Sequence, residues 1–314
     1  MTVHRIRITD LRQPELTDIQ RLALAHGESH PVDLTVDAVL TAAVDRAGLD
    51  DFGPDGFRDR LALWLEEMDS DGERTGLGRL TMFRDCVRYA VNRLRIHDTL
   101  SRHPEIRDTD IVAPIIVVGL PRSGTTHLVN LLASDTRLRS LPLWESYEPV
   151  PDPNELPGPD GLDPRYRRAE EQWQAMEAML PSMSAMHPMR PDHIHEELEL
   201  QLPDFSSYQL EWVARVPRWR DWYLAHDQTP HYTSLKTVLQ ILQWQRPGER
   251  WVLKSPQHLE QLGPLLTVFP DATVVISHRD PVSVVQSAAT MTAYAARMSY
   301  RTPQPDGCSS RPST

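Results

Sequence analysis

The first third of the chain carries the spacing of amphipathic helices. From about residue 35 to 104, apolar residues recur at intervals of three and four among Asp, Glu and Arg residues. Such intervals place apolar side chains on one face of a helix, where they can pack against a core. We therefore expect residues 1–110 to form a helical N-terminal region, and the apolar positions that support it are Leu40, Val44, Leu61, Leu65, Leu77, Leu80, Val87, Ala90 and Leu94.

Three short apolar runs later in the chain predict strands. Residues 114–119, 251–254 and 273–277 are largely apolar, and β-branched residues are frequent in them. This texture is typical of strands buried on both faces of a sheet. A helical pattern follows each run, around Leu128, over 257–268 and over 281–297. The alternation of strand and helix predicts a parallel sheet covered by helices, with right-handed crossovers.

A long segment separates the first expected strand from the second. Residues 135–248 begin with a proline-rich connection and then show four helical patterns. We expect them to form a helical insertion within an α/β domain of residues 111–300. The binding crevice of such a domain lies at the carboxyl ends of the strands. The four patterns in the insertion lie around residues 165–180, 194–201, 206–226 and 231–246.

Composition and charge narrow the function classes. The net charge of −11 argues against a nucleic-acid or anionic-membrane surface, since both need a basic footprint. Cys86 and Cys308 are too few and too distant for a disulfide framework, which favours a reducing cytoplasm. The N-terminus lacks the apolar run of a signal peptide, and no apolar run approaches the ~20 residues of a membrane span. We expect a cytoplasmic protein without a transmembrane segment.

The turn after the first strand has the glycine spacing of a phosphate-binding loop. Gly119 and Gly124 flank four residues between the strand and a helix, so backbone N–H groups and the helix N-terminus can face an anion. A nucleotide triphosphatase carries lysine where this chain has Thr125. Arg122 within the turn supplies a planar fork of donors instead. We therefore expect a P-loop-like sheet that binds an anion other than a magnesium-bound triphosphate.

The sequence Pro121-Arg-Ser-Gly-Thr-Thr126 resembles the 5′-phosphosulfate loop of sulfotransferases that use 3′-phosphoadenosine 5′-phosphosulfate (PAPS). The match is to the arginine form of the bacterial branch. The resemblance implies an α/β fold and a PAPS co-substrate. It also implies that the sulfate and the 5′-phosphate are bound by Arg122, Ser123, Gly124, Thr125 and Thr126.

A second anion site is expected after the third strand. Arg279 ends that strand, Asp280 and Pro281 begin the next helix, and Ser287 lies eight residues beyond the arginine. Taken alone, Arg279 could serve as an ordinary ion-pair partner. Its spacing to Ser287 resembles the 3′-phosphate site of the family. The resemblance implies that both residues bind the phosphate that distinguishes PAPS from other nucleotides.

Four residues are candidates for catalysis. Lys254 and His258 follow the second strand and resemble the catalytic lysine and histidine of the family, with two extra residues between them. The lysine could neutralise the leaving oxygen, and the histidine could take a proton from the acceptor. His258 could equally be a capping or packing residue. Glu196 and Glu197 resemble a Glu-containing segment of the bacterial branch and offer a rival base, or else a solvated helix face.

The expected reaction moves a sulfuryl group to a hydroxyl, or an amine, of a small-molecule or lipid-like acceptor. The helical insertion of residues 135–248 would lie on the acceptor side. No metal-ligand spacing is present in the sequence. Residues 301–314 are expected to be a disordered or truncated tail, which leaves open an inactive nucleotide-binding protein. A P-loop kinase is the remaining alternative, disfavoured by the missing lysine.

Overall fold

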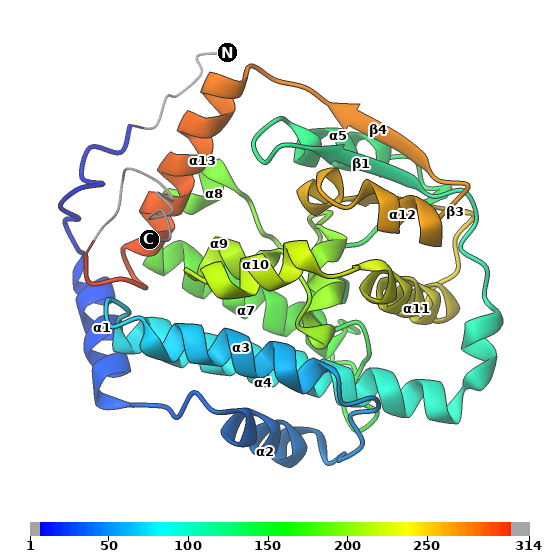
Figure 1. Cartoon of the computed structure of the whole chain (residues 1–314), viewed down its shortest axis with the longest axis horizontal. Coiled ribbons are helices and arrows are strands. Elements are labelled where there is room, and N and C mark those ends of the chain that lie inside the picture. Colours follow the sequence, from blue (N-terminus) through cyan, green and yellow to red (C-terminus); the bar gives the residue numbers. More distant parts are fainter. Residues whose placement is uncertain (1–6, 303–314) are drawn as a thin grey trace.

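A parallel sheet of four strands, in the order β2-β3-β1-β4, lies at one side of the molecule, opposite the long helices of the N-terminal region (Figure 1). The structure is a computed structural model that describes residues 7–302. Most of the tail expected over 301–314 therefore lies outside the described residues. All three strand pairings are parallel, so the α/β prediction is confirmed. The strands are β1 (Ile115–Gly119), β2 (Leu138–Arg139), β3 (Arg250–Lys254) and β4 (Thr273–Ser277).

Strand β1 is central and packs on both faces, as its sequence predicts. Its odd and even side chains enter different clusters: Ile116 and Val118 pack toward helices α11 (Thr229–Gln245) and α12 (Leu262–Val268). Val117 packs on the other face against helix α5 (Thr125–Leu132). Helices on both faces shield this strand from solvent. They also fix the position of the loop that follows it.

Strand β4 corrects one prediction. It was expected to be buried on both faces, yet Thr273 and Ile276 are exposed, the latter to 48%. The reason is its position, because within the described residues β4 pairs only with β1 and forms the edge of the sheet. An apolar, β-branched run predicts a strand well, but it does not tell a central strand from an edge strand.

The N-terminal region is helical, as predicted from residue 35 onward, but its first helix was not anticipated. Ile19 and Leu22 of helix α1 have helical spacing but remain exposed, and the buried residues of the helix are Gln20 and Gly27. A Cβ on Gly27 would lie 2.1 Å from the backbone nitrogen of Leu77, so backbone meets backbone where α1 crosses α4. The region comprises α1 (Asp18–Ser29), α2 (Val36–Ala47), α3 (Phe57–Ser70), α4 (Gly76–Arg102) and the 3-10 helix η1 (Pro104–Asp108).

The insertion is helical but more broken than predicted. The helix expected around 194–201 is a 3-10 helix shifted toward the C-terminus, and Pro203 lies inside it. The helix expected over 206–226 is divided, since Pro217 begins a new helix and Val216 before it is non-helical. The elements are α6 (Leu143–Tyr147), α7 (Pro164–Met179), α8 (Met183–Met186), η2 (Glu197–Asp204), α9 (Gln209–Val213), α10 (Pro217–Ala225) and α11.

Beyond β3 the expected helix over 257–268 is likewise divided, into η3 (Pro256–Leu259) and α12. The last helix, α13 (Pro281–Ala296), begins as predicted: the Asp280 side chain accepts from the Ser283 N–H, and Pro281 occupies the first turn. Short strand β2 was not predicted, because two residues carry no periodicity. No helix of the described chain is long and apolar enough to cross a membrane.

The N-terminal helices and the insertion share one hydrophobic core. Side chains of α2, α3 and α4 pack with Phe205, Trp219 and Tyr223 of the insertion. Asp204 links the two parts at the edge of this core, because its carboxylate accepts hydrogen bonds from Arg60 and Arg93 and contacts His231. The insertion is therefore held from two sides, because part of it packs against the N-terminal helices and its last helix, α11, packs against the sheet.

Candidate functional site

The loop between β1 and α5 has the backbone of an anion-binding turn. Gly124 adopts φ 95° and begins α5, and Arg122 adopts φ 72°. No side chain caps the first turn of α5, so its N–H groups face outward at the positive end of the helix. A Cβ on Gly119 would lie 2.3 Å from Ser277 Oγ, which explains the glycine there. Ser123 shares a 2.8 Å hydrogen bond with the same hydroxyl.

Three predicted anion-binding residues meet beside this loop. Arg122 Nε donates to Ser287 Oγ at 3.0 Å, and its Nη1 donates to the Met186 carbonyl at 2.5 Å. Arg279 Nη1 donates to the Arg122 carbonyl at 2.9 Å. Burial and the neighbouring Arg279 lower the pKa of Arg122. Within residues 7–302 neither guanidinium forms an ion pair with a carboxylate, so two adjacent cations are left to attract an anion.

Lys254 lies at the same edge of the sheet. Strand register places it opposite Val117, and the Ser255 N–H that follows donates to the Val117 carbonyl at 3.2 Å. The Lys254 ammonium is 1% exposed, donates to Thr126 Oγ1 at 3.1 Å and forms an ion pair with Glu196. One ammonium thus links the loop to the insertion.

Glu196 is the carboxylate of this site. Its side chain is 14% exposed, and Lys254 is its ion-pair partner. Burial alone would raise the pKa of Glu196, but the Lys254 ammonium and then nearby His195 and His187 lower it. The carboxyl is therefore ionised at neutral pH and can accept a proton.

Glu197 and His258 lie behind Lys254, away from solvent. Glu197 Oε2 accepts from the Lys254 backbone N–H at 2.7 Å, and its Oε1 lies 2.6 Å from His258 Nε2. The other ring nitrogen of His258 lies 2.7 Å from the Tyr232 hydroxyl. Glu197, His258 and Tyr232 are all fully buried. In this arrangement both ring nitrogens of His258 are occupied.

The remaining loop residues differ in solvent exposure and in the side chains that they contact. Thr125 is buried at 3% exposure, whereas Thr126 reaches Lys254 and Ser123 reaches strand β4. Sequence reasoning missed Ser277, because a strand-terminal serine carries no motif. It also missed two polar side chains of the insertion, His187 and Glu199, for which sequence offers no spacing signal.

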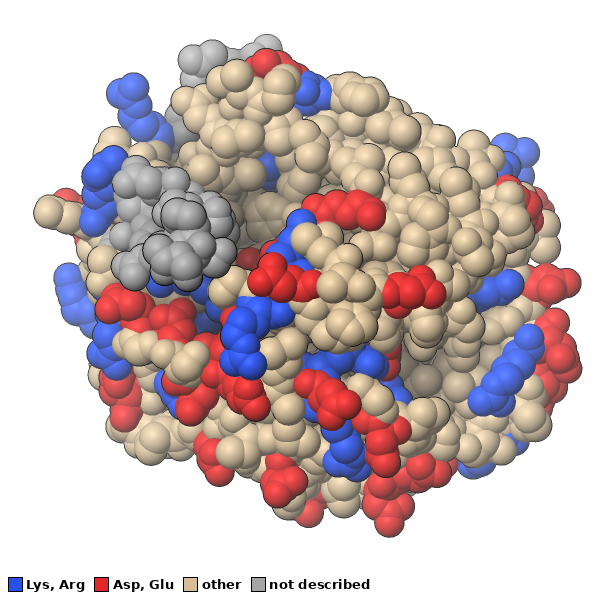
Figure 2. Space-filling view, viewed as in Figure 1, with Lys and Arg blue, Asp and Glu red and all other residues tan. Residues whose placement is uncertain are grey.

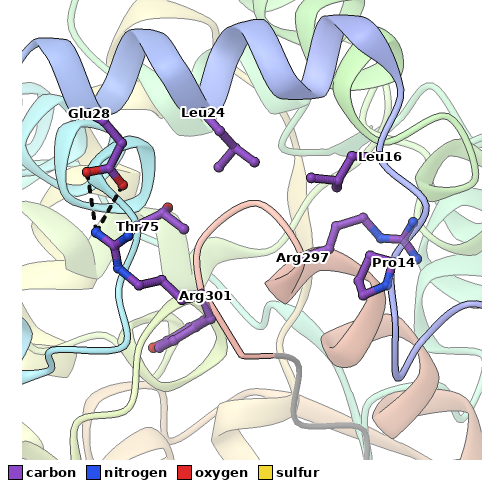
Figure 3. A pocket seen from close by; sticks show the side chains of 8 residues that line it. Pro14, Leu16, Leu24, Glu28, Thr75, Arg297 and Arg301 are labelled. Carbon is purple, nitrogen blue, oxygen red and sulfur yellow. Dashed lines mark hydrogen bonds and ion pairs between the residues drawn. The ribbon is translucent and has the colours of Figure 1, made fainter.

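A cavity of about 340 Å³ lies elsewhere, between α1 and the end of α13 (Figure 3). An ion pair between Glu28 and Arg301 spans one side of it at 3.0 Å. It contains none of the predicted site residues and is not where the candidate chemistry lies. Its lining residues are Pro14, Leu16, Leu24, Glu28, Thr75, Arg297, Tyr300 and Arg301.

Charged side chains are distributed unevenly on the surface. In the view of Figure 2, acidic and basic residues are interspersed over the helical lower half, and the part around the sheet is mostly uncharged. No broad basic patch is visible on that face. This agrees with the net charge of −11 and with an anion site built from a few local cations.

Comparisons of the sequence and of the structure with known proteins agree with one another. A family model described as the sulfotransferase family matches residues 114–311. The crystal structure of sulfotransferase STF9 from Mycobacterium avium is 29% identical, with a TM-score of 0.75, and the match covers 85% of this chain and 68% of that one. That of sulfotransferase STF1 from Mycobacterium tuberculosis is 31% identical, with a TM-score of 0.72, covering 82% and 71%. A search of the curated proteins found no match.

Proposed function

The chain belongs to the sulfotransferase family, and from that premise we propose that it transfers the sulfuryl group of PAPS to a hydroxyl, or an amine, of a small-molecule or lipid-like acceptor. One observation carries the proposal: the Lys254 ammonium contacts both Thr126 of the loop and the carboxylate of Glu196. A cation, an anion-binding loop and an ionised base at one point are what this reaction needs. The cysteine content favours a cytoplasmic setting.

Two groups of residues would hold the donor. Arg122, Ser123, Gly124, Thr125 and Thr126 would bind the sulfate and the 5′-phosphate through the loop backbone, the hydroxyls and the guanidinium. Arg279 and Ser287 would bind the 3′-phosphate. Their contacts with Arg122 support this assignment, since the Ser287 hydroxyl accepts from the Arg122 guanidinium and the Arg279 guanidinium donates to the Arg122 carbonyl. Phosphate oxygens would replace the present contacts of these guanidinium groups.

Glu196 and Lys254 would carry the chemistry. As the acceptor oxygen bonds to sulfur, Glu196 would take its proton. The bond between sulfur and the bridging oxygen breaks, and Lys254 would neutralise the charge on that oxygen as 3′-phosphoadenosine 5′-phosphate leaves. Positioning and electrostatics dominate in this kind of in-line displacement. The lowered pKa of Glu196 keeps the carboxylate ionised at neutral pH, and it also makes the carboxylate a weaker base, so the effect depends on its position beside the acceptor.

His258 fits a supporting role better than that of the base. Its ring is 1% exposed and its two nitrogens face Glu197 and Tyr232. Glu197 in turn accepts from the Lys254 backbone, so the pair fixes the end of β3. We therefore assign the role of general base to Glu196. Glu197 and His258 would position Lys254.

Two titrations and one transfer assay test the function. We expect 3′-phosphoadenosine 5′-phosphate to bind, ATP with magnesium to bind far more weakly, and labelled PAPS to pass its sulfate to an alcohol. ATP binding without binding of the bisphosphate would contradict the proposal and favour a kinase. Binding of the bisphosphate without transfer to any acceptor would favour a non-catalytic nucleotide-binding protein.

A further inference from the structure

Glu199 is a buried carboxyl that the proposed reaction does not use. It lies one turn beyond Glu196, whose carbonyl accepts from the Glu199 N–H at 3.3 Å. The residue is 4% exposed, and its Oε2 has no hydrogen-bond partner within the described structure. Oε1 accepts only a long 3.4 Å bond from Gln209. Buried polar atoms are normally satisfied, so an open carboxyl oxygen needs an explanation.

The nearest cation does not satisfy this carboxyl. Arg88 Nη1 is 3.9 Å from Glu199 Oε2, too far for a hydrogen bond. Arg88 is held elsewhere: it donates to the Tyr147 carbonyl at 3.2 Å, and its guanidinium lies 4.5 Å from the centre of the Tyr147 ring. Burial accordingly raises the pKa of Glu199 to about 7, with Arg88 opposing and Glu196 adding to the rise.

Two histidines lie beside Glu199 and Glu196 in the interior. His195 Nε2 is 3.7 Å from Glu199 Oε1, and the rings of His187 and His195 meet edge to face at 6.0 Å. His187 Nδ1 is buried without a partner in the described part of the chain. Burial lowers the pKa of each histidine to about 3, although Glu196 is near enough to oppose the shift. Both imidazoles are therefore neutral near pH 7 and offer hydrogen bonds without a fixed charge.

The position of this surface connects it to the transfer site. His187 follows Met186, whose carbonyl accepts from Arg122 of the loop, and Glu196 pairs with Lys254. The unpaired buried atoms of His187 and Glu199 thus belong to side chains that lie near the carboxylate we assign as base. A group bound to them would be next to the hydroxyl that loses its proton.

We propose that Glu199 and His187 bind additional hydroxyl groups of the acceptor, so that the acceptor is a neutral polyhydroxylated compound, such as a sugar or a glycoside. This inference rests on the proposed function. Hydroxyls both donate and accept, which suits a carboxyl beside neutral imidazoles. A plain alkyl alcohol would leave these buried groups unpaired, and an anionic acceptor would meet Glu196 and Glu199.

A matched pair of acceptors tests the inference. Octyl β-D-glucopyranoside and 1-octanol share an alkyl chain, and only the first carries a ring of hydroxyls. With labelled PAPS and the full chain we expect kcat/KM for the glucoside to exceed that for octanol by on the order of 100-fold or more, because sites built for hydroxyls reject analogues that lack them. Equal values, or a preference for octanol, would overturn the inference and leave the proposed function standing. Transfer to neither would overturn both.

Two variants separate recognition from folding. Glu199→Gln keeps the shape of the side chain, and His187→Ala removes a half-buried ring. Each is expected to lower kcat/KM for the glucoside about 10-fold more than kcat/KM for octanol, and to leave bisphosphate binding unchanged. Glu211→Gln is the matched control, because Glu211 is another carboxyl with a pKa raised by burial to about 7, but it pairs with Arg220. An equal loss with both alcohols, or no loss with either, would contradict a role in recognition.

Discussion

The proposed donor side and the proposed acceptor side of the site are built in different ways. On the donor side, charged and hydroxyl groups project from a short loop and from the ends of β3 and β4, so strand register brings them together. On the acceptor side, His187, His195 and Glu199 come from segments whose positions depend on the packing of the insertion against α4 and the sheet. The first side depends on local backbone geometry, the second on distant parts of the fold.

This difference has an electrostatic counterpart. Arg122 and Arg279 stand side by side and neither forms an ion pair with a carboxylate in the described structure, which leaves the proposed donor side cationic. The acceptor side holds neutral imidazoles and a carboxyl whose pKa is about 7. A cationic surface suits a bisphosphate and a nearly neutral one suits hydroxyls. Lys254 and Glu196 form the boundary between the two.

The largest effect is expected at that boundary. Lys254→Ala removes the cation that we propose faces the leaving oxygen, and it should slow turnover by about 10²–10⁴, as losses of charge stabilisation in active sites do. Binding of 3′-phosphoadenosine 5′-phosphate should change by only a few-fold. Single-turnover transfer and calorimetric titration measure the two quantities. A loss of binding as large as the loss of rate would mean that Lys254 belongs to the donor side alone.

Arg279→Ala should act on the donor side. Loss of a charge-assisted bond of about 1.5–3 kcal/mol predicts bisphosphate binding weaker by about 10- to 100-fold. The rate from bound PAPS should change little. Arg301→Ala is a suitable control, because Arg301 is also a surface arginine but pairs with Glu28 beside the remote cavity. Equal effects of the two substitutions would show that the 3′-phosphate site is wrongly placed.

Glu199 should give the acceptor side a pH signature. Its folded pKa of about 7 lies above the ordinary 4.5, so the folded chain holds a proton that the unfolded chain releases. This contribution to stability is complete below about pH 4.5 and is lost as the pH rises through 7, a difference of about 3 kcal/mol. Glu199→Gln should abolish that part of the slope in denaturant unfolding measured from pH 4 to 8. A slope that persists in the variant would contradict the assignment.

The smallest effect on turnover is expected for a substitution at Tyr232, which lies behind Lys254. Tyr232→Phe removes the hydroxyl that faces His258 and leaves one ring nitrogen unpaired in the core. We expect a loss of about 1–2 kcal/mol in the free energy of unfolding and a turnover rate lowered by a few-fold at most. Tyr208→Phe, at a partly exposed tyrosine, is a comparison for the general effect of removing a hydroxyl. If turnover instead slowed by about two orders of magnitude without a loss of stability, His258 would return to the role of base.

Sequence reasoning succeeded where chemistry is encoded locally. Strands β1 and β3, the loop between Gly119 and Thr126, and the Asp280 cap all follow from short patterns, and the structure contains each of them. The register of parallel strands then makes neighbours of Lys254 and the loop without further information. The family was evident from the same residues.

Sequence reasoning failed where packing decides. Helix α1 meets α4 through the backbone at Gly27 while its Ile19 and Leu22 stay exposed, so its apolar spacing does not mark the contact. The edge position of β4 depends on which strands pair, and its own residues do not encode that. Glu196 and Glu197 are neighbours in sequence, yet the first pairs with the Lys254 ammonium and the second is buried against the Lys254 backbone and His258. Only the three-dimensional arrangement separates their roles.

The most direct test of the central claim compares two isosteric substitutions. We expect single-turnover transfer of labelled sulfate from PAPS to octyl β-D-glucopyranoside to fall by about 10²-fold or more in Glu196→Gln, with bisphosphate binding unchanged. His258→Gln, corrected for any loss of folded protein, should keep a rate within about 10-fold of the wild type. The reverse order, with His258→Gln inactive and Glu196→Gln active, would contradict the assignment of Glu196 as the base.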